Sequence, residues 1–160
     1  MTPKLRGILS VGVLILTLAI LAWGLREVFT REVPGGNDLY PRWAAGCAWL
    51  SQGIDPYSQE ATLSVQQGIY GRPALPSEDQ VAFAYPIFVM AAVWPLCLTP
   101  DFATAHAATM AALMAGVIGS AILARRVSGW KVGGWLWPWI LFWIVISYPS
   151  ARSILLGQLA

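Results

Sequence analysis

Four long stretches of the chain contain no Asp, Glu, Lys or Arg, and they determine the first expectation about its fold. These stretches are residues 7–25, 80–100, 102–124 and 132–151. Each is close to the roughly 20 residues that a helix needs to cross the hydrocarbon core of a bilayer. The pattern therefore predicts an all-α fold, a polytopic transmembrane helical bundle with about four membrane segments.

One hydrophilic region separates the first stretch from the others. We expect residues 7–28 to form the first transmembrane helix, residues 29–80 to form an extracytoplasmic loop, and residues 81–160 to contain further membrane helices. Lys4 and Arg6 precede the first helix, which places the amino terminus in the cytoplasm and the loop outside. The first apolar run is longer than the roughly 7 to 15 residues of a secretory signal, so it is interpreted as a retained anchor.

The loop is predicted to contain short amphipathic helices. Asn37 or Asp38 can cap the first, Pro41 suits its first turn and Gly53 ends it. Apolar side chains recur between these ends at helical spacing, at Leu39, Trp43, Cys47 and Leu50. With its two tryptophans, this helix is expected to lie along the membrane surface.

A second helix is predicted over residues 58–67, followed by a loop over residues 68–76, which are rich in Gly and Pro. Prolines also interrupt residues 81–98. If those residues cross the membrane fully, the later cations of residues 125–131 fall outside, against the positive-inside tendency, and if they dip and return, these cations fall inside. We favour a full but broken crossing and keep the return as the alternative.

Composition narrows the class of protein. Of the 160 residues 57% are hydrophobic and 11% are charged, against about 25% charged residues in a soluble domain. The net charge of +2 and the scattered Lys and Arg argue against a nucleic-acid partner. No nucleotide-binding or metalloprotease motif occurs, so no cofactor is expected, and a divalent metal is possible but not indicated. Cys47 and Cys97 fit no ligand spacing and are interpreted as small apolar filler rather than as a disulfide or metal ligands.

Asp38 is the first candidate for chemistry, because it follows the first membrane helix and can face both the membrane boundary and water. A carboxylate there can act as a general base, or it can merely cap the helix. Arg42 lies four residues later and would share a face with Asp38 on a helix that starts at Asp38. It can hold a phosphate, pair with Asp38 or contact lipid headgroups.

Further candidates are aromatic or polar groups near the apolar segments. Asp55 and Tyr57 form a turn with Pro56, which can present a carboxylate and a ring together or be a plain turn. Tyr85 marks the entry to the second apolar segment, as part of a binding site or as an interface anchor. Arg152 and Gln158 lie within apolar sequence, where they should face protein or a cavity, although Arg152 can also snorkel to headgroups. His106 is expected to be a packing residue.

Several short motifs occur in an order that resembles a known family. They are Asn37-Asp38-Leu39-Tyr40, Gly53-Ile54-Asp55-Pro56-Tyr57, Phe83-Ala84-Tyr85-Pro86, Trp94-Pro95-Leu96 and Leu156-Gly157-Gln158, after an amino-terminal helix. This order resembles the start of glycosyltransferase family 87, in the GT-C superfamily of membrane enzymes that use polyprenyl-phosphate sugars. Two positions depart from the family pattern, because Ile87 replaces a second proline and Leu159 follows Gln158.

The resemblance implies a GT-C fold and assigns roles to the residues that match. Asp38 would be the catalytic base. The substrate-binding residues would be Tyr40, Arg42, Asp55, Tyr57, Tyr85, Arg152 and Gln158. GT-C enzymes typically have about twice as many membrane helices as are expected here, so residues 1–160, a single membrane domain, are expected to be the amino-terminal part of a longer enzyme.

The implied activity is transfer of a sugar, with inversion, from a polyprenyl-phosphate donor to a hydroxyl of a glycan or glycolipid acceptor. It would take place at the outer face of the bacterial inner membrane, with the lipid bilayer as a further partner. Two alternatives stay open at this point, a transporter or flippase of lipid-linked saccharides and a non-catalytic membrane subunit.

Overall fold

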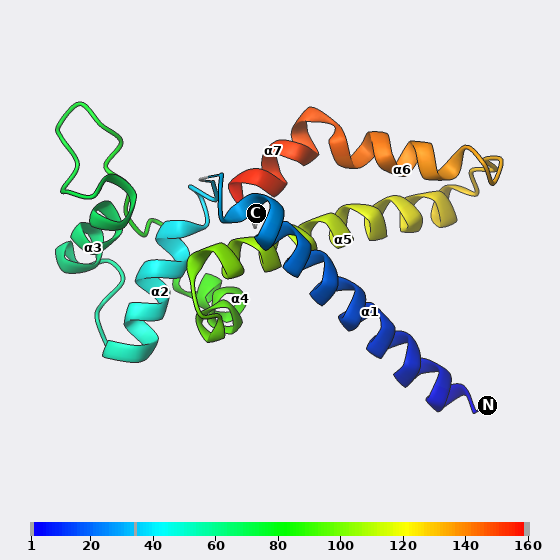
Figure 1. The fold of residues 1–160 in the computed structure, drawn as a ribbon, viewed down its shortest axis with the longest axis horizontal. Coiled ribbons are helices and arrows are strands. Elements are labelled where there is room, and N and C mark those ends of the chain that lie inside the picture. The colour runs from blue at the N-terminus through cyan, green and yellow to red at the C-terminus, as the bar shows by residue number, and fades with distance from the viewer. Residues whose placement is uncertain (1, 34, 159–160) are drawn as a thin grey trace. The chain divides into compact units, whose positions relative to one another are not determined.

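The computed structural model describes residues 2–33 and 35–158, and within these ranges the protein is helical and has no strand. The chain forms two compact units. The long-helix unit comprises Met1–Gly35 and His106–Ala160, and the loop unit comprises Gly36–Ala105. Figure 1 labels the helices of both units.

The long-helix unit contains the helices that can cross a membrane. Helix α1 (Pro3–Leu25) continues into one π-helical segment, η1 (Arg26–Thr30). Helix α5 (Phe102–Ser128), whose first residues belong to the loop unit, is the second long apolar helix. Helices α6 (Trp137–Ile146) and α7 (Tyr148–Leu156) form a pair bent by 57°.

By length and composition, two helices of the described chain can span a membrane, or three if the bent pair is one span. This is fewer than the four or so membrane segments that the sequence predicted. The bend follows from Pro149, which lacks the N–H that would continue the helical hydrogen bonds, and the backbone leaves the helical region at Ser147 (ψ 143°).

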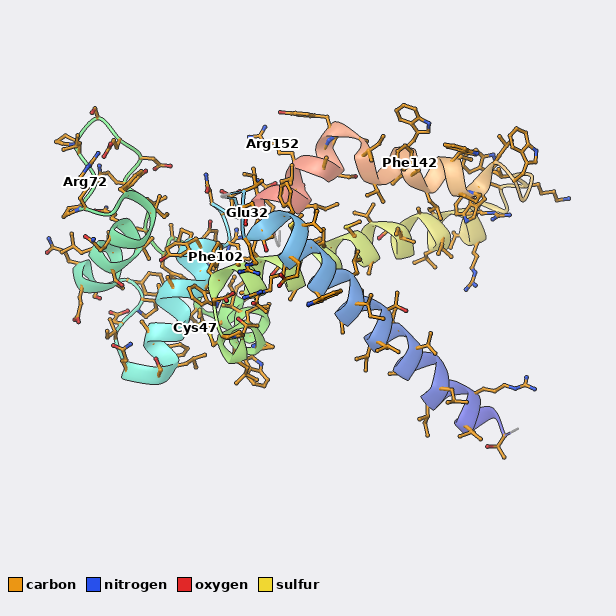
Figure 2. The ribbon with its side chains drawn as sticks, viewed as in Figure 1. Glu32, Cys47, Arg72, Phe102, Phe142 and Arg152 are labelled. Carbon is orange, nitrogen blue, oxygen red and sulfur yellow. A yellow bond between two sulfur atoms is a disulfide. The ribbon has the colours of Figure 1, made fainter. Side chains whose placement is uncertain are left out.

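The surface of α1 indicates a membrane protein. Its apolar side chains are exposed along the whole helix, with 64% of Val13 and 62% of Ile15 accessible. Helix α6 presents Phe142 and its neighbours in the same way (Figure 2). In water, apolar surface on this scale is unfavourable, whereas lipid tails solvate it.

The loop unit begins with two helices that the sequence largely predicted. Helix α2 (Tyr40–Gln52) has Pro41 in its first turn and ends at Gly53, which has a left-handed backbone (φ 72°). The N-cap position is Leu39 rather than Asn37 or Asp38, so the predicted cap is wrong. Helix α3 (Gln59–Tyr70) is capped by Ser58, whose hydroxyl accepts a hydrogen bond from the Ala61 amide at 3.1 Å.

The predicted loop over residues 68–76 begins too early, because α3 includes Gly68 and ends only at Gly71. Gly68 is retained inside the helix for a reason of packing. A β-carbon at this position would overlap the hydroxyl oxygen of Tyr40 on α2 and lie 2.8 Å from its Cε1 atom. Glycine therefore lets α2 and α3 approach closely.

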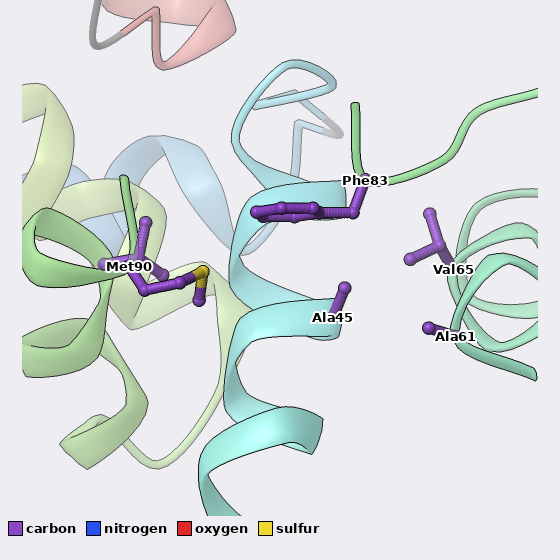
Figure 3. Packing of buried hydrophobic residues seen from close by; sticks show 6 residues of the cluster. Ala45, Ala61, Val65, Phe83 and Met90 are labelled. Carbon is purple, nitrogen blue, oxygen red and sulfur yellow. The ribbon is translucent and has the colours of Figure 1, made fainter. Parts of the chain in front are cut away.

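The core of the loop unit is small and lies on both sides of α2 (Figure 3). Its buried members are Ala45, Ala61, Val65, Phe83, Met90 and Val93. On one side α2 contacts α3, where alanines keep the helices close, and on the other side it contacts the short helices that follow Pro86.

Those short helices are η2 (Ile87–Val89), α4 (Met90–Val93) and η3 (Trp94–Leu98), of 3, 4 and 5 residues. Together they fall well short of the roughly 20 residues that a crossing requires. The full crossing favoured from the sequence is therefore wrong. Pro95 lacks a backbone N–H, and helical geometry there tightens to a 3₁₀-helix that packs on α2 instead of extending.

Candidate functional site

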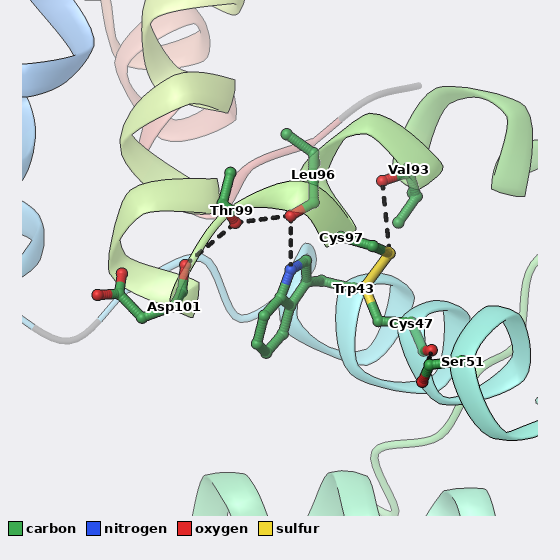
Figure 4. Close-up of a disulfide and its surroundings, with 8 residues drawn as sticks. All are labelled: Trp43, Cys47, Ser51, Val93, Leu96, Cys97, Thr99 and Asp101. Carbon is green, nitrogen blue, oxygen red and sulfur yellow. Dashed lines mark hydrogen bonds between the residues drawn. A yellow bond between two sulfur atoms is a disulfide. The ribbon is translucent and has the colours of Figure 1, made fainter.

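A disulfide between Cys47 and Cys97 fastens α2 to η3 (Figure 4). Their Cα atoms are 5.4 Å apart and 50 positions separate them in the sequence. The interpretation of both cysteines as apolar filler is wrong. It assigned Cys97 to a membrane-crossing segment, whereas η3 folds back onto α2 and brings the two side chains together.

Trp43 strengthens the same contact. Its indole Nε1 donates a hydrogen bond to the Leu96 carbonyl oxygen at 3.2 Å, and its ring packs against Phe102 with centroids 5.3 Å apart. Leu39 is buried as well. The apolar stripe of α2 therefore faces protein at Leu39, Trp43 and Cys47, whereas Leu50 at its end is exposed.

A cationic and aromatic cluster lies beside this core, and we call Arg42, Tyr57, Phe83 and Tyr85 the Arg42 cluster. The Arg42 guanidinium carbon lies 3.9 Å from the centroid of the Tyr85 ring. The Tyr57 hydroxyl donates a hydrogen bond to the Tyr85 carbonyl oxygen at 2.5 Å. Phe83 is buried and meets both tyrosines edge to face, with centroids 5.2 Å and 5.7 Å apart.

Burial and ring stacking determine how the Arg42 guanidinium can interact with a phosphate. Arg42 is buried, with 6% of its surface accessible. Stacking uses the flat face of the guanidinium, whereas its N–H donors point outward in the plane. A buried guanidinium is also screened weakly by water, so its attraction for a phosphate is strong.

Asp55 builds the turn that presents Tyr57. Its Oδ1 accepts a hydrogen bond from the Tyr57 amide at 3.0 Å, and its carbonyl oxygen accepts one from the Ser58 amide at 3.0 Å. An Asp side chain favours such a turn because its carboxylate accepts a hydrogen bond from the amide two residues later, and Pro56 restricts the backbone between the two residues. The exposed Asp55 carboxylate therefore stabilises the turn.

Asp38 lies in the turn that leads into α2. Gly36, with a left-handed backbone (φ 71°), starts this turn, and its carbonyl oxygen accepts hydrogen bonds from the amides of Leu39 and Tyr40, both at 2.8 Å. Asp38 is half-buried and precedes the helix. Because α2 starts at Tyr40, Asp38 precedes the helix that carries Arg42 and does not start it as predicted.

Tyr40 packs behind this turn. Its ring meets Phe102 edge to face, with centroids 4.8 Å apart. Burial raises the pKa of the Tyr40 hydroxyl above its usual range, so this group stays protonated at neutral pH. It can donate a hydrogen bond but is a poor base.

Arg152 and Gln158 belong to the long-helix unit. Arg152 Nη1 donates to the Tyr148 hydroxyl at 3.2 Å, and both line a cleft of about 450 Å³ along α7. Gln158 Oε1 accepts from the Ser153 hydroxyl at 3.4 Å. His106 Nε2 donates to the Leu155 carbonyl oxygen at 3.0 Å, which is the packing role that the sequence predicted.

Within residues 2–33 and 35–158, no three His, Cys, Asp or Glu side chains gather as metal ligands would. Comparison of the chain with protein-family models, with curated proteins and with solved structures yields no match. The likeness to glycosyltransferase family 87 therefore depends on the ordered motifs alone.

Proposed function

We propose that the chain is the amino-terminal part of a bacterial membrane glycosyltransferase that takes its sugar from a polyprenyl-phosphate donor. The observation that carries the proposal is the Arg42 cluster. In it the buried Arg42 guanidinium lies 3.9 Å from the centroid of the Tyr85 ring, and the Tyr57 hydroxyl donates a hydrogen bond to the Tyr85 carbonyl oxygen. Such a cluster offers a cation for a phosphate and aromatic faces for a sugar. Asp38 lies in the turn directly before the helix that carries Arg42.

Two independent features support a position of the loop unit outside the cytoplasm. A disulfide such as Cys47–Cys97 forms and persists in oxidising compartments. The second feature is charge. If α1 crosses outward and the short helices do not cross, α5 returns to the cytoplasm and places Arg125, Arg126 and Lys131 inside, in agreement with the positive-inside tendency.

Exposed apolar side chains of the loop unit support a position at the membrane boundary. The short helices expose large side chains, with 74% of Phe88 and 77% of Leu98 accessible, and Trp94 is also exposed. Apolar and aromatic groups of this kind favour the boundary between headgroups and acyl chains. A phosphate attached to a polyprenyl chain lies at the same depth.

In the proposed reaction the Asp38 carboxylate accepts the proton of an acceptor hydroxyl. The oxygen attacks the anomeric carbon from the side opposite the phosphate, and the bond between that carbon and the phosphate oxygen breaks, which inverts the configuration. The electron pair leaves with the polyprenyl phosphate, whose growing negative charge Arg42 stabilises. The proton stays on Asp38 until water removes it.

The test uses the full-length protein with a radiolabelled polyprenyl-phosphate sugar and follows label in the acceptor. Asp38→Asn should abolish transfer and Arg42→Gln should reduce it about 100-fold or more, as expected for loss of a transition-state contact. Asp79→Asn, in the same unit and exposed, is the matched control and should retain transfer. Turnover by Asp38→Asn at the rate of the control would refute the proposed base.

A further inference from the structure

A positively charged cleft lies where α5 ends and α6 begins. Its volume is about 470 Å³. It is lined by Ile122, Arg125, Arg126, Gly129, Trp130 and Trp137. Gly129, with a left-handed backbone (φ 64°), turns the chain after α5, and the connection that follows leads into α6 (Figure 1).

Arg125 is held in place within this cleft. Its guanidinium carbon lies 4.5 Å from the centroid of the Trp137 ring, and its Nη2 donates to the Val132 carbonyl oxygen at 3.4 Å. Arg126, the next residue along the helix, is exposed. The cleft therefore combines one positioned guanidinium with one that reaches solvent, between two tryptophans.

No acidic side chain lines this cleft. From Phe102 to the end of the sequence there are four Lys or Arg residues and no Asp or Glu. None of the ion pairs between described residues includes Arg125, Arg126 or Lys131. Basic residues in the last turn of a helix are stabilised by the negative end of the helix dipole. The dipole does not explain why tryptophans line the cleft beside these arginines.

A separate apolar groove lies along the part of α5 that precedes the cleft, and Ile144 of α6 also lines it. It has a volume of about 580 Å³. It is lined by Ala112, Leu113, Gly116, Val117, Ser120, Ala121, Ala124 and Ile144. Small residues recur every four positions along α5, which hollows this face, and a β-carbon at Gly116 would meet no atom within 4 Å. The lining is almost wholly apolar, which suits an acyl chain.

We propose that the cleft and the groove together bind one anionic phospholipid, with its phosphate between Arg125 and Arg126 and one acyl chain along the small-residue face of α5. The cleft lies just where the candidate span Phe102–Ser128 ends, which is the depth of lipid headgroups. Charge complementarity selects an anionic headgroup over a zwitterionic one, and the tryptophans suit the interface.

The experiment measures lipids retained by the detergent-solubilised full chain in native mass spectrometry. Equal amounts of phosphatidylglycerol and phosphatidylcholine with the same acyl chains are added. Wild-type protein should retain phosphatidylglycerol preferentially. Arg125→Gln and Arg126→Gln should each lower this preference about fivefold, the effect of one cation near an anionic surface.

Control variants separate this site from general attraction and from a phosphate-only site. Arg6→Gln removes an exposed cation from the start of α1 and should leave the preference unchanged. Gly116→Leu fills the groove and should weaken lipid retention without changing any response to inorganic phosphate. Equal loss with Arg6→Gln, full displacement of lipid by inorganic phosphate, or a dimer that excludes lipid would each overturn the proposal.

Discussion

Removal of the Cys47–Cys97 disulfide should strongly destabilise the loop unit, because little else stabilises it. The bond closes a loop in which the two residues are 50 positions apart. In the chain-entropy treatment, opening a loop of this size costs about 4 kcal/mol of stability. A whole domain is typically stable by about 5–15 kcal/mol, and the core here is dominated by small side chains. We therefore expect the loop unit to lose much of its free energy of unfolding when the disulfide is removed.

The assay is limited proteolysis of the full chain in detergent, with and without a reductant. Wild-type protein should resist cleavage between α2 and η3 until it is reduced, whereas Cys47→Ser/Cys97→Ser should be cleaved rapidly in both conditions. The double variant is its own control for side effects of the reductant. Resistance of the double variant equal to that of wild type, or alkylation of Cys47 and Cys97 in oxidised wild-type protein, would contradict this expectation.

The same bond tests the proposed orientation. In intact cells, a thiol reagent that does not cross membranes should label Cys47 and Cys97 only after reduction. Labelling that requires the membrane to be permeabilised would place the loop unit in the cytoplasm.

Two further predictions concern the loop unit. In Gly68→Ala the added methyl overlaps the rigid ring of Tyr40, which should destabilise the loop unit by about 1–3 kcal/mol. The higher helix propensity of alanine offsets roughly 1 kcal/mol of this destabilisation. Gly46→Ala should cost less, because it meets the flexible end of Met90, and equal shifts in the unfolding temperature of the two variants would contradict this packing. Arg72 donates hydrogen bonds to the Glu78 carboxylate from its two terminal guanidinium nitrogens, at 2.6 Å and 2.8 Å, and holds the pKa of Glu78 at about 2. Since this pKa is lowered in the folded state, the contribution to stability is present above about pH 4.5 and is lost as the pH falls toward 2. Hydrogen exchange of residues 72–80 should rise over that window in wild type but show a smaller step in Arg72→Gln, in which the Leu75 amide still donates a hydrogen bond to the Glu78 carboxylate.

Local features of this protein were predictable because they depend on neighbours in the sequence. The charge-free runs indicated apolar helices, and α1 and α5 are long enough to cross a membrane. Gly53 ends α2 and Ser58 starts α3 because glycine tolerates a left-handed backbone and a serine hydroxyl accepts an amide hydrogen bond.

The tertiary structure decided what depends on the path of the chain between distant residues. Residues 87–98 are as apolar as a membrane segment, but their backbone folds onto α2, so Cys97 meets Cys47 instead of lipid. Arg42 and Tyr85 meet for the same reason. Composition cannot distinguish an apolar segment buried against protein from one solvated by lipid, because both environments exclude water, and only the fold determines which of them surrounds a given side chain.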